Sequence, residues 1–352
     1  MRQRNKLSFF LTAALCLCTL CCASCGGKNT EGESPKRIRH VTAERKLRIG
    51  YSMDTLALER WQRDLDIFMN KSKELGAEVI VQNAGNSVEE QNKQLLYLLE
   101  REVSVVVVVA KKRDSLTESI KTLRSRGVDV ISYDRLISDA DISLYISVNT
   151  ERVGELMAQQ FLSQGVGSRW YLILGPDEDY NMALLQQGIR KGIQGKNVSI
   201  MGTFYTDGWN YDISYNETVR LITEGIIPNA IICGNDAVAG SVINAMEDFY
   251  PDRHIPVCGQ DADIAACQDV VRGKQDFTVY KPISELAEKA AEYAVKLASG
   301  MDVENIVPSR QRINNGFADI PVVWLEPELV TKDNIDDVII KSGFHTAGEV
   351  YR

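Results

Sequence analysis

Apolar residues along this chain follow two periods that alternate with each other. In its first part, short apolar runs typical of buried strands lie at 47–52, 78–82, 104–110, 128–133 and 143–148. Between these runs the apolar positions recur every three to four residues, which predicts helices at 59–75, 88–101 and 114–126. The run at 105–109 is continuously β-branched, as expected of a central parallel strand covered on both faces.

A second series of the same kind follows. Its predicted strands are 170–175, 198–205, 229–234, 255–259 and 276–280, with further extended pieces at 312–325. Its predicted helices are 151–164, 180–194, 211–224, 236–248, 264–273 and 283–299. Two consecutive series predict an α/β fold of two doubly wound parallel-sheet lobes, with a first crossing between them at 147–150.

The N-terminal segment has a different pattern, which indicates export. A cationic start is followed by an apolar run at 7–20 and by small residues around Cys25, which predicts a signal peptide at 1–25. The segment resembles a bacterial lipoprotein signal with Cys25 as the lipidated residue. Cys21 or Cys22, or an ordinary cleaved signal, are the alternatives. Residues 26–45 have no apolar period and are expected to form a flexible tether.

Composition limits the class of protein. The 352 residues are 44% apolar and 25% charged, which is typical of a soluble globular chain. The net charge of −8, with no basic block in the body of the chain, argues against nucleic-acid binding. The cysteines of the body, Cys233, Cys258 and Cys267, form no CxxC and do not cluster with histidines, which argues against a metal site. Cys233 and Cys258 are expected as buried free thiols, with a disulfide as the alternative. No cofactor is expected.

Polar and aromatic residues gather directly after the predicted strands. The carboxyl ends of parallel strands form the edge where open α/β sheets bind ligands. The candidate ligand-binding residues at these positions are Arg60, Trp61, Asp134, Arg135, Asp179, Asn181, Trp209, Asn235, Asp261 and Lys281.

These residue types suit a sugar. The rings of Trp61 and Trp209 can cover the apolar C–H faces of a pyranose. Asp and Asn side chains can pair with its hydroxyls, and Arg and Lys can donate to its oxygens. An Asp or Asn after a strand also serves as a helix N-cap, and Asp236 and Asp263 are open to that simpler interpretation.

Several of these motifs together carry a family resemblance that runs from about 47 to 345. The chain resembles the D-xylose-binding proteins of bacterial ABC importers. The motifs are Leu58-Glu-Arg-Trp-Gln-Arg-Asp64, Tyr133-Asp-Arg135 with Ser138-Asp-Ala-Asp-Ile142, Asp207-Gly-Trp209, Gly234-Asn-Asp236, Gly259-Gln-Asp-Ala-Asp263 and Thr278-Val-Tyr-Lys-Pro282.

The resemblance implies a type I periplasmic binding protein fold, in which two lobes joined by three hinge strands close over one sugar. It assigns the pentose contacts to the candidate residues above, with the two tryptophans as stacking rings. It implies a first lobe of 46–147 plus 282–310 and a second lobe of 148–281 plus 311–347. Tyr180 departs from the family pattern and is expected to narrow the pocket, which leaves the sugar less fixed than its class.

The expected function is an extracytoplasmic sugar-binding protein, lipid-anchored at Cys25 and monomeric, that carries D-xylose to a membrane permease and its ATPase. Ribose, glucose or galactose remain as alternative ligands. A chemoreceptor or sensor kinase remains as an alternative partner, because the sugar site would be the same.

Two other classes fit less well. A glycoside hydrolase would need one protonated acid, but Asp134 lies beside Arg135, and Lys281 lies within reach of Asp261, which favours two ionised carboxylates. A transcriptional repressor of a related fold would need a helix-turn-helix where this chain has an export signal. The chain is therefore not expected to be an enzyme.

Overall fold

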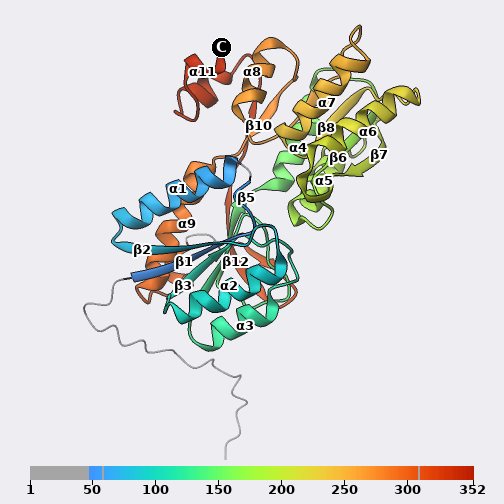
Figure 1. Ribbon diagram of the computed structural model, residues 1–352. Coiled ribbons are helices and arrows are strands. Elements are labelled where there is room, and N and C mark those ends of the chain that lie inside the picture. Colours follow the sequence, from blue (N-terminus) through green and yellow to red (C-terminus); the bar gives the residue numbers. More distant parts are fainter. Residues whose placement is uncertain (1–46, 58, 308–309) are drawn as a thin grey trace, which may run out of the picture. The chain divides into compact units, whose positions relative to one another are not determined.

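The computed structural model describes residues 47–57, 59–307 and 310–352 (Figure 1). Its first sheet has seven strands in the order β11-β12-β5-β4-β3-β1-β2, parallel except for β11 against β12. The strands are β1 (Leu47–Met53), β2 (Ala77–Asn83), β3 (Val105–Val108), β4 (Asp129–Tyr133), β5 (Leu144–Val148), β11 (Arg312–Asn314) and β12 (Asp319–Leu325).

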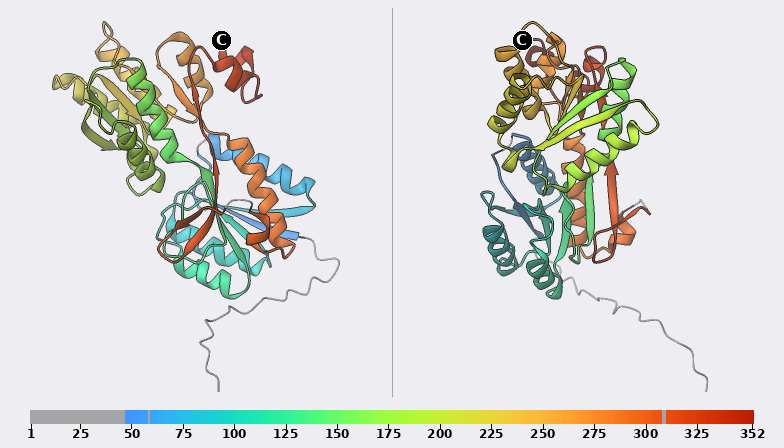
Figure 2. Two further views of the ribbon diagram at one scale, coloured as in Figure 1. Left: turned by 180° about the vertical axis from the view of Figure 1, so that it is seen from behind. Right: turned by 90° about the vertical axis from the view of Figure 1, so that its right-hand side faces the viewer.

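Helices cover both faces of this sheet. α1 (Glu59–Glu74) and α9 (Ile283–Ala298) pack side by side on one face, and α2 (Val88–Glu100) and α3 (Thr117–Ser125) lie on the other (Figure 2). Successive β3 residues point to opposite faces, so Val105 packs toward α1 and α9 and Val106 toward α2 and α3. This two-sided burial accounts for the continuously β-branched strand. The sheet and these helices are called the first lobe below.

The second lobe has a sheet of the same design. Four parallel strands run in the order β7-β6-β8-β9, a single bridge joins Cys258 to Phe277, and β10 then pairs antiparallel with β13. The strands are β6 (Arg169–Leu174), β7 (Ser199–Tyr205), β8 (Ala230–Cys233), β9 (Val257–Cys258), β10 (Thr278–Tyr280) and β13 (Glu328–Val330). The helices are α4 (Thr150–Ser163), α5 (Tyr180–Gly192), α6 (Tyr211–Thr223), α7 (Asp236–Phe249) and α8 (Ile264–Arg272). The prediction of two doubly wound lobes is confirmed.

The chain passes between the lobes at 148–150, 280–283 and 325–328. The expectation that 283–299 returns to the first lobe agrees with the packing of α9. The assignment of 311–325 to the second lobe was wrong, because β12 pairs in parallel with β5 and extends the first sheet. Apolar periodicity identifies a strand, but it does not indicate which sheet supplies the partner.

The C-terminal part of the chain packs on the second lobe. It contains β13, a π-helical turn at Asp336–Ile340 and the short helix α11 (Ala347–Val350). α11 lies beside α8 (Figure 1). Short elements outside the two sheets are a 3₁₀ turn at Asp207–Trp209 and α10 (Val303–Ile306).

Some predictions concern residues that the structure does not describe. The signal peptide, the tether and the lipidation site Cys25 all lie outside the described residues. Among the residues that are described, no helix is long and apolar enough to cross a membrane. Cys233 and Cys258 are buried free thiols, as the sequence led us to expect, and Cys267 is also a buried free thiol. Burial raises the pKa of the Cys233 thiol well above its ordinary value.

Candidate functional site

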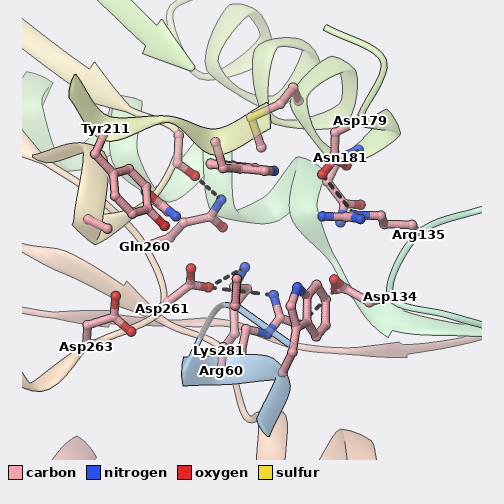
Figure 3. A pocket seen from close by; sticks show the side chains of 17 residues that line it. Arg60, Asp134, Arg135, Asp179, Asn181, Tyr211, Gln260, Asp261, Asp263 and Lys281 are labelled. Carbon is pink, nitrogen blue, oxygen red and sulfur yellow. Dashed lines mark hydrogen bonds and ion pairs between the residues drawn. The ribbon is translucent and has the colours of Figure 1, made fainter. Parts of the chain in front are cut away.

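A cavity of about 240 Å³ lies where strands of both sheets end (Figure 3). The structure brings together all ten candidate residues around it. They are Arg60, Trp61, Asp134, Arg135, Asp179, Asn181, Trp209, Asn235, Asp261 and Lys281. Residues that sequence reasoning did not select also line it, and these are Ala57, Met182, Tyr211, Gly234, Ala237, Gln260 and Asp263. The expectation that ligand-binding residues directly follow the strands therefore identified most of the polar residues that line the cavity.

The first-lobe face of the cavity consists of Arg60, Trp61, Asp134 and Arg135. Arg60, in the first turn of α1, donates through Nη2 to Asp134 Oδ1 at 2.9 Å. Asp134 follows β4 and has a φ of 62°, so the chain turns sharply and presents the carboxylate to α1. Burial alone would raise the pKa of Asp134, but Arg60, Lys281 and Arg135 hold it below its ordinary value.

Arg135 is held by a carboxylate from each lobe. Its Nη1 donates to Asp54 Oδ2 at 2.5 Å, and its Nε lies 3.0 Å from Asp179 Oδ2. Both carboxylates are almost fully buried. The ring of Trp61 lies beneath both guanidinium groups, with Cζ of Arg60 and Arg135 at 4.5 and 5.4 Å from the ring centroid. Trp61 therefore supports the two arginines as well as lining the cavity.

A buried acid lies behind this face. Asp64, one helical turn after Arg60, has Oδ2 3.9 Å from Arg60 Nε and accepts from the Tyr133 hydroxyl at 2.8 Å. Burial raises the pKa of Asp64 to about 7, although Arg60 and the Tyr133 hydrogen bond oppose the rise. Asp64 is thus the ionisable support for a cavity residue.

The neutral polar and aromatic residues of the second-lobe face are Asn181, Trp209, Tyr211, Asn235 and Gln260, and its acidic residues are Asp179, Asp261 and Asp263. Two residues of this face are helix N-caps. Asp179 is the N-cap of α5 and accepts from the Asn181 backbone N–H, and Asn235 is the N-cap of α7 and accepts from the Val238 N–H. The helix starts thus fix where the side chains of this face emerge from the backbone.

Trp209 lies in the 3₁₀ turn before α6, with a φ of 59°. Its ring packs directly on the backbone of Gly175, where a Cβ atom would lie 2.3 Å from the ring. Gly175 is therefore needed for the indole to occupy this position, since any side chain there would displace it.

Buried polar atoms without a hydrogen-bond partner in the described part of the chain line both faces of the cavity, and Trp61 Nε1 is one of them on the first-lobe face. Trp209 Nε1, Asn181 Oδ1 and Gln260 Oε1 are buried and have no hydrogen-bond partner among the described residues. Gln260 Nε2 donates to the Gly234 carbonyl at 2.6 Å, which turns Oε1 away from that contact. A buried polar group left unpaired costs free energy, so these atoms indicate where a ligand would bind.

An ion cluster joins the two faces. Lys281 Nζ lies 2.5 Å from Asp261 Oδ1, and Arg60 Nη1 lies 3.7 Å from the same oxygen (Figure 3). Arg60 belongs to the first lobe and Asp261 to the second, while Lys281 lies where the chain crosses between them. We call these three residues the Arg60–Asp261–Lys281 cluster.

Tyr180 does not narrow the cavity. It is not among the lining residues, and its ring packs against apolar side chains of the first lobe beside α2 and α3. The guanidinium carbon of Arg113 lies 6.0 Å from the ring centroid. As the first residue of α5, Tyr180 points away from the side on which Asn181 faces the cavity.

The fold and the site together can be compared with known proteins. A family model described as a periplasmic binding protein domain matches residues 49–302. The chain belongs to the periplasmic binding proteins. This periplasmic binding protein is 35% identical over 314 residues to the D-xylose-binding periplasmic protein of Haemophilus influenzae, covering 87% of this chain and 92% of that protein. It is also 35% identical over 323 residues to the D-xylose-binding periplasmic protein of Escherichia coli, covering 89% and 96%.

Solved structures of sugar-binding proteins have the same fold. The periplasmic binding protein matches a solute-binding protein of an ABC transporter from Clostridium phytofermentans with bound β-D-glucose, with a TM-score of 0.78, 25% identity, and 86% and 99% of the two chains covered. A carbohydrate transporter solute-binding protein from Chloroflexus aurantiacus in complex with D-glucose has the same fold, with a TM-score of 0.79 at 24% identity over 87% and 98%. The predicted family and type I fold are confirmed. These relatives are binding proteins rather than enzymes, as was expected of this chain.

Proposed function

We propose that this protein binds one monosaccharide, with D-xylose as the leading candidate, and delivers it to an ABC importer. One observation carries the proposal. A single cavity gathers indole rings, ionised side chains and amides from both lobes, and several of its buried polar atoms have no partner among the described residues. A sugar would satisfy these atoms, because each of its hydroxyls both donates and accepts.

The roles of the lining residues follow from their chemistry. The indole N–H of Trp209 would donate to a ring hydroxyl, and Asn181 Oδ1 would accept from a neighbouring one. The carboxylates of Asp134 and Asp261 would accept from hydroxyls while remaining paired with cations. A sugar that lacks the matching hydroxyl would leave these buried groups unpaired, and this is the physical source of selectivity.

D-xylose is favoured among the sugars by the two relatives named for it, each 35% identical over most of this chain. The glucose-bound relative at 25% identity supports the monosaccharide class. Ribose, galactose and glucose are accordingly the competitors to test.

Transport would use closure of the two lobes. Arg60 with Asp261 and Arg135 with Asp179 are ion pairs between residues of different lobes, so they form only when the lobes are together. A sugar in contact with both faces adds to these pairs and favours the closed form. The permease and its ATPase would recognise that form. Export by the signal at 1–25 and a lipid anchor at Cys25 would hold this monomer at the membrane surface.

Binding without chemistry suits the carboxylates at this site. A glycoside hydrolase needs a protonated acid, whose pKa is raised by its surroundings. Asp134 instead has its pKa lowered by neighbouring cations, with Arg60 nearest. The site therefore keeps this carboxylate ionised, as an acceptor of hydrogen bonds from hydroxyl groups.

The deciding experiment is a calorimetric titration of the protein from Gly26 onward, freed of co-purified sugar. D-xylose is compared with ribose, arabinose, glucose and galactose, and the series is repeated with Trp209→Ala. Tight binding of xylose that is lost in Trp209→Ala is expected. Tight binding of another sugar instead would replace the ligand, and the absence of heat with all five would overturn the proposed ligand class.

The partner needs a test in cells. Deletion of a neighbouring permease should abolish high-affinity uptake of the sugar. Unchanged uptake, together with loss of a sugar-induced response when the binding protein itself is deleted, would favour a chemoreceptor or sensor kinase as the partner.

A further inference from the structure

The C-terminal segment at Phe344–His345 lies outside the cavity, but it contacts three parts of the chain that carry the Arg60–Asp261–Lys281 cluster. Arg63 lies one turn after Arg60 on α1, Ala262 directly follows Asp261, and Tyr280 directly precedes Lys281. Phe344 or His345 contacts each of these three neighbours.

Phe344 contacts Arg63 through both its backbone carbonyl and its ring. Arg63 Nη2 donates to the Phe344 carbonyl oxygen at 2.7 Å, and the Arg63 guanidinium carbon lies 4.1 Å from the centroid of the Phe344 ring. The edge of the same buried ring meets Tyr280, with centroids 4.8 Å apart. Phe344 thereby links α1 of the first lobe to β10 of the second.

His345 supports a loop with an unfavourable backbone. Its Nε2 lies 2.8 Å from the Ala262 carbonyl oxygen, and because a carbonyl can only accept, Nε2 carries the proton there. The Cys267 thiol also reaches this oxygen, at 3.4 Å. Asp261 and Ala262 have φ angles of 103° and 55°, which non-glycine residues adopt only when their surroundings hold them.

We propose that Arg63, Phe344 and His345 form a C-terminal clamp that positions Arg60 and Asp261 for the ligand and holds the lobes together when it is bound. His345 fixes the backbone that aims the Asp261 carboxylate. Arg63 connects the turn of α1 that contains Arg60 to the Phe344–His345 segment. The clamp rests on the proposed sugar-binding function and adds positioning residues that do not line the cavity.

The partial exposure of Arg63 and His345 distinguishes a positioning role of the clamp from simple packing in the core. Arg63 and His345 are both half-buried, so truncating either removes little apolar contact from the core. Their loss is therefore expected to act on the closed, ligand-bound form more than on the folded state itself.

The test compares Arg63→Ala, His345→Ala and His345→Gln with the wild type and with Arg253→Ala. Arg253→Ala is a matched control, because Arg253 also lies over an aromatic ring, that of Tyr250, at 5.9 Å, and neither residue lines the cavity. Titration calorimetry with D-xylose gives affinity, stopped-flow tryptophan fluorescence gives the dissociation rate, and thermal unfolding without sugar gives stability.

We expect Arg63→Ala and His345→Ala each to weaken binding about tenfold, the effect of one hydrogen bond lost in the bound form, mainly through faster dissociation. Their sugar-free unfolding temperatures should stay near that of the wild type. His345→Gln, whose amide can donate to the Ala262 carbonyl, should recover most of the affinity, and Arg253→Ala should match the wild type.

Unchanged affinity in both alanine variants would overturn the clamp, as would losses of affinity that only track lowered unfolding temperatures. A wild-type protein that binds none of the five sugars would overturn the proposed function, and the clamp with it. If the wild type binds another of the five sugars, the variants are compared with that sugar, and the same outcomes support or overturn the clamp.

Discussion

On the first-lobe face of the cavity the charged side chains are ion-paired within the protein, whereas several neutral side chains of the second-lobe face have buried polar atoms without a hydrogen-bond partner in the part of the chain that the structure describes. Arg60 has Asp134, and Arg135 has Asp54 and Asp179. On the other side, Trp209 Nε1 and Asn181 Oδ1 are buried with no partner among the described residues.

This difference between paired charges and unpaired neutral atoms explains how one cavity can be stable without a ligand and selective for the ligand that it binds. Buried charges are tolerated only when paired, so the first-lobe face must be complete before a ligand arrives. A buried neutral polar atom costs less free energy to leave unpaired than a buried charge does. The neutral groups of the second-lobe face can therefore remain unpaired until the ligand binds. Removing a charged residue from the first-lobe face should therefore damage both folding and binding, and removing a second-lobe side chain whose polar atom has no partner among the residues described, such as Asn181, should damage binding alone.

The largest effect is expected for Arg60→Ala. The substitution leaves Asp134 and Asp64 as buried carboxylates without their cation, which costs about 3–5 kcal/mol of folding stability. Sugar affinity should fall at least about a hundredfold, because Asp261 also loses its cross-lobe partner. Thermal unfolding and calorimetric titration measure the two losses.

Arg48→Ala serves as the control for Arg60→Ala. Arg48 pairs with Glu78 and Glu102 on the same lobe at 3.8 and 3.7 Å, but its side chain is 42% exposed. An exposed pair contributes at most about 1 kcal/mol. If Arg60→Ala proved no more harmful than Arg48→Ala, the first-lobe face would not depend on internal ion pairing.

Asn181→Ala tests the opposite face. Asn181 Oδ1 has no partner to lose in the sugar-free protein, so the unfolding temperature should be unchanged or slightly raised. Affinity should fall about tenfold, the effect of one hydrogen bond to the ligand. A marked loss of stability in the empty protein would contradict the distinction between the faces.

Asp64→Asn tests the ionisable support behind the first-lobe face. The pKa of Asp64 is raised to about 7 in the folded protein, so between about pH 4 and pH 7 the folded state binds a proton that the unfolded state releases. Stability from this group is therefore greatest at the acidic end and falls as the pH rises toward 7. The loss should amount to about 2 kcal/mol between about pH 5 and pH 7.

Asp64→Asn should flatten this part of the stability profile, as measured by chemical unfolding at a series of pH values. Asp66→Asn on the exposed side of the same helix is the control and should leave the slope unchanged. An unaltered slope in Asp64→Asn would mean that another group is responsible for it.

Much of this site could be predicted from sequence because its polar residues follow strands. A residue directly after a parallel strand lies at one sheet edge whatever the rest of the chain does, and this placed Asp134, Asn235 and Asp261 correctly around the cavity. Gln260 was not among the candidate residues, although it lies in the Gly259-Gln-Asp261 motif and lines the cavity. Its position at the end of β9 is the sequence signal that could have identified it.

The relations between distant segments could not be predicted. Periodicity identified extended pieces at 312–325, but β5, the partner of β12, is more than 170 positions earlier, and nothing local selects it over the second sheet. The pairing of Arg135 with Asp54 likewise spans 81 positions. Such pairings are fixed by tertiary packing, which a local pattern does not contain.

The smallest effect is expected for Tyr180→Phe, at the edge of the second-lobe face. The helical rotation of α5 sends residue 180 toward Arg113 and the first-lobe core, while residue 181 turns into the cavity. Removing the hydroxyl should leave the affinity for each sugar, and the order of preference among them, within about twofold of the wild type, because a group outside the cavity makes no differential contact with the ligand. Parallel titrations with pentoses and hexoses measure this. A changed order of preference would mean that Tyr180 reaches the bound sugar, and specificity would then depend on the junction between the lobes as well as on the two faces.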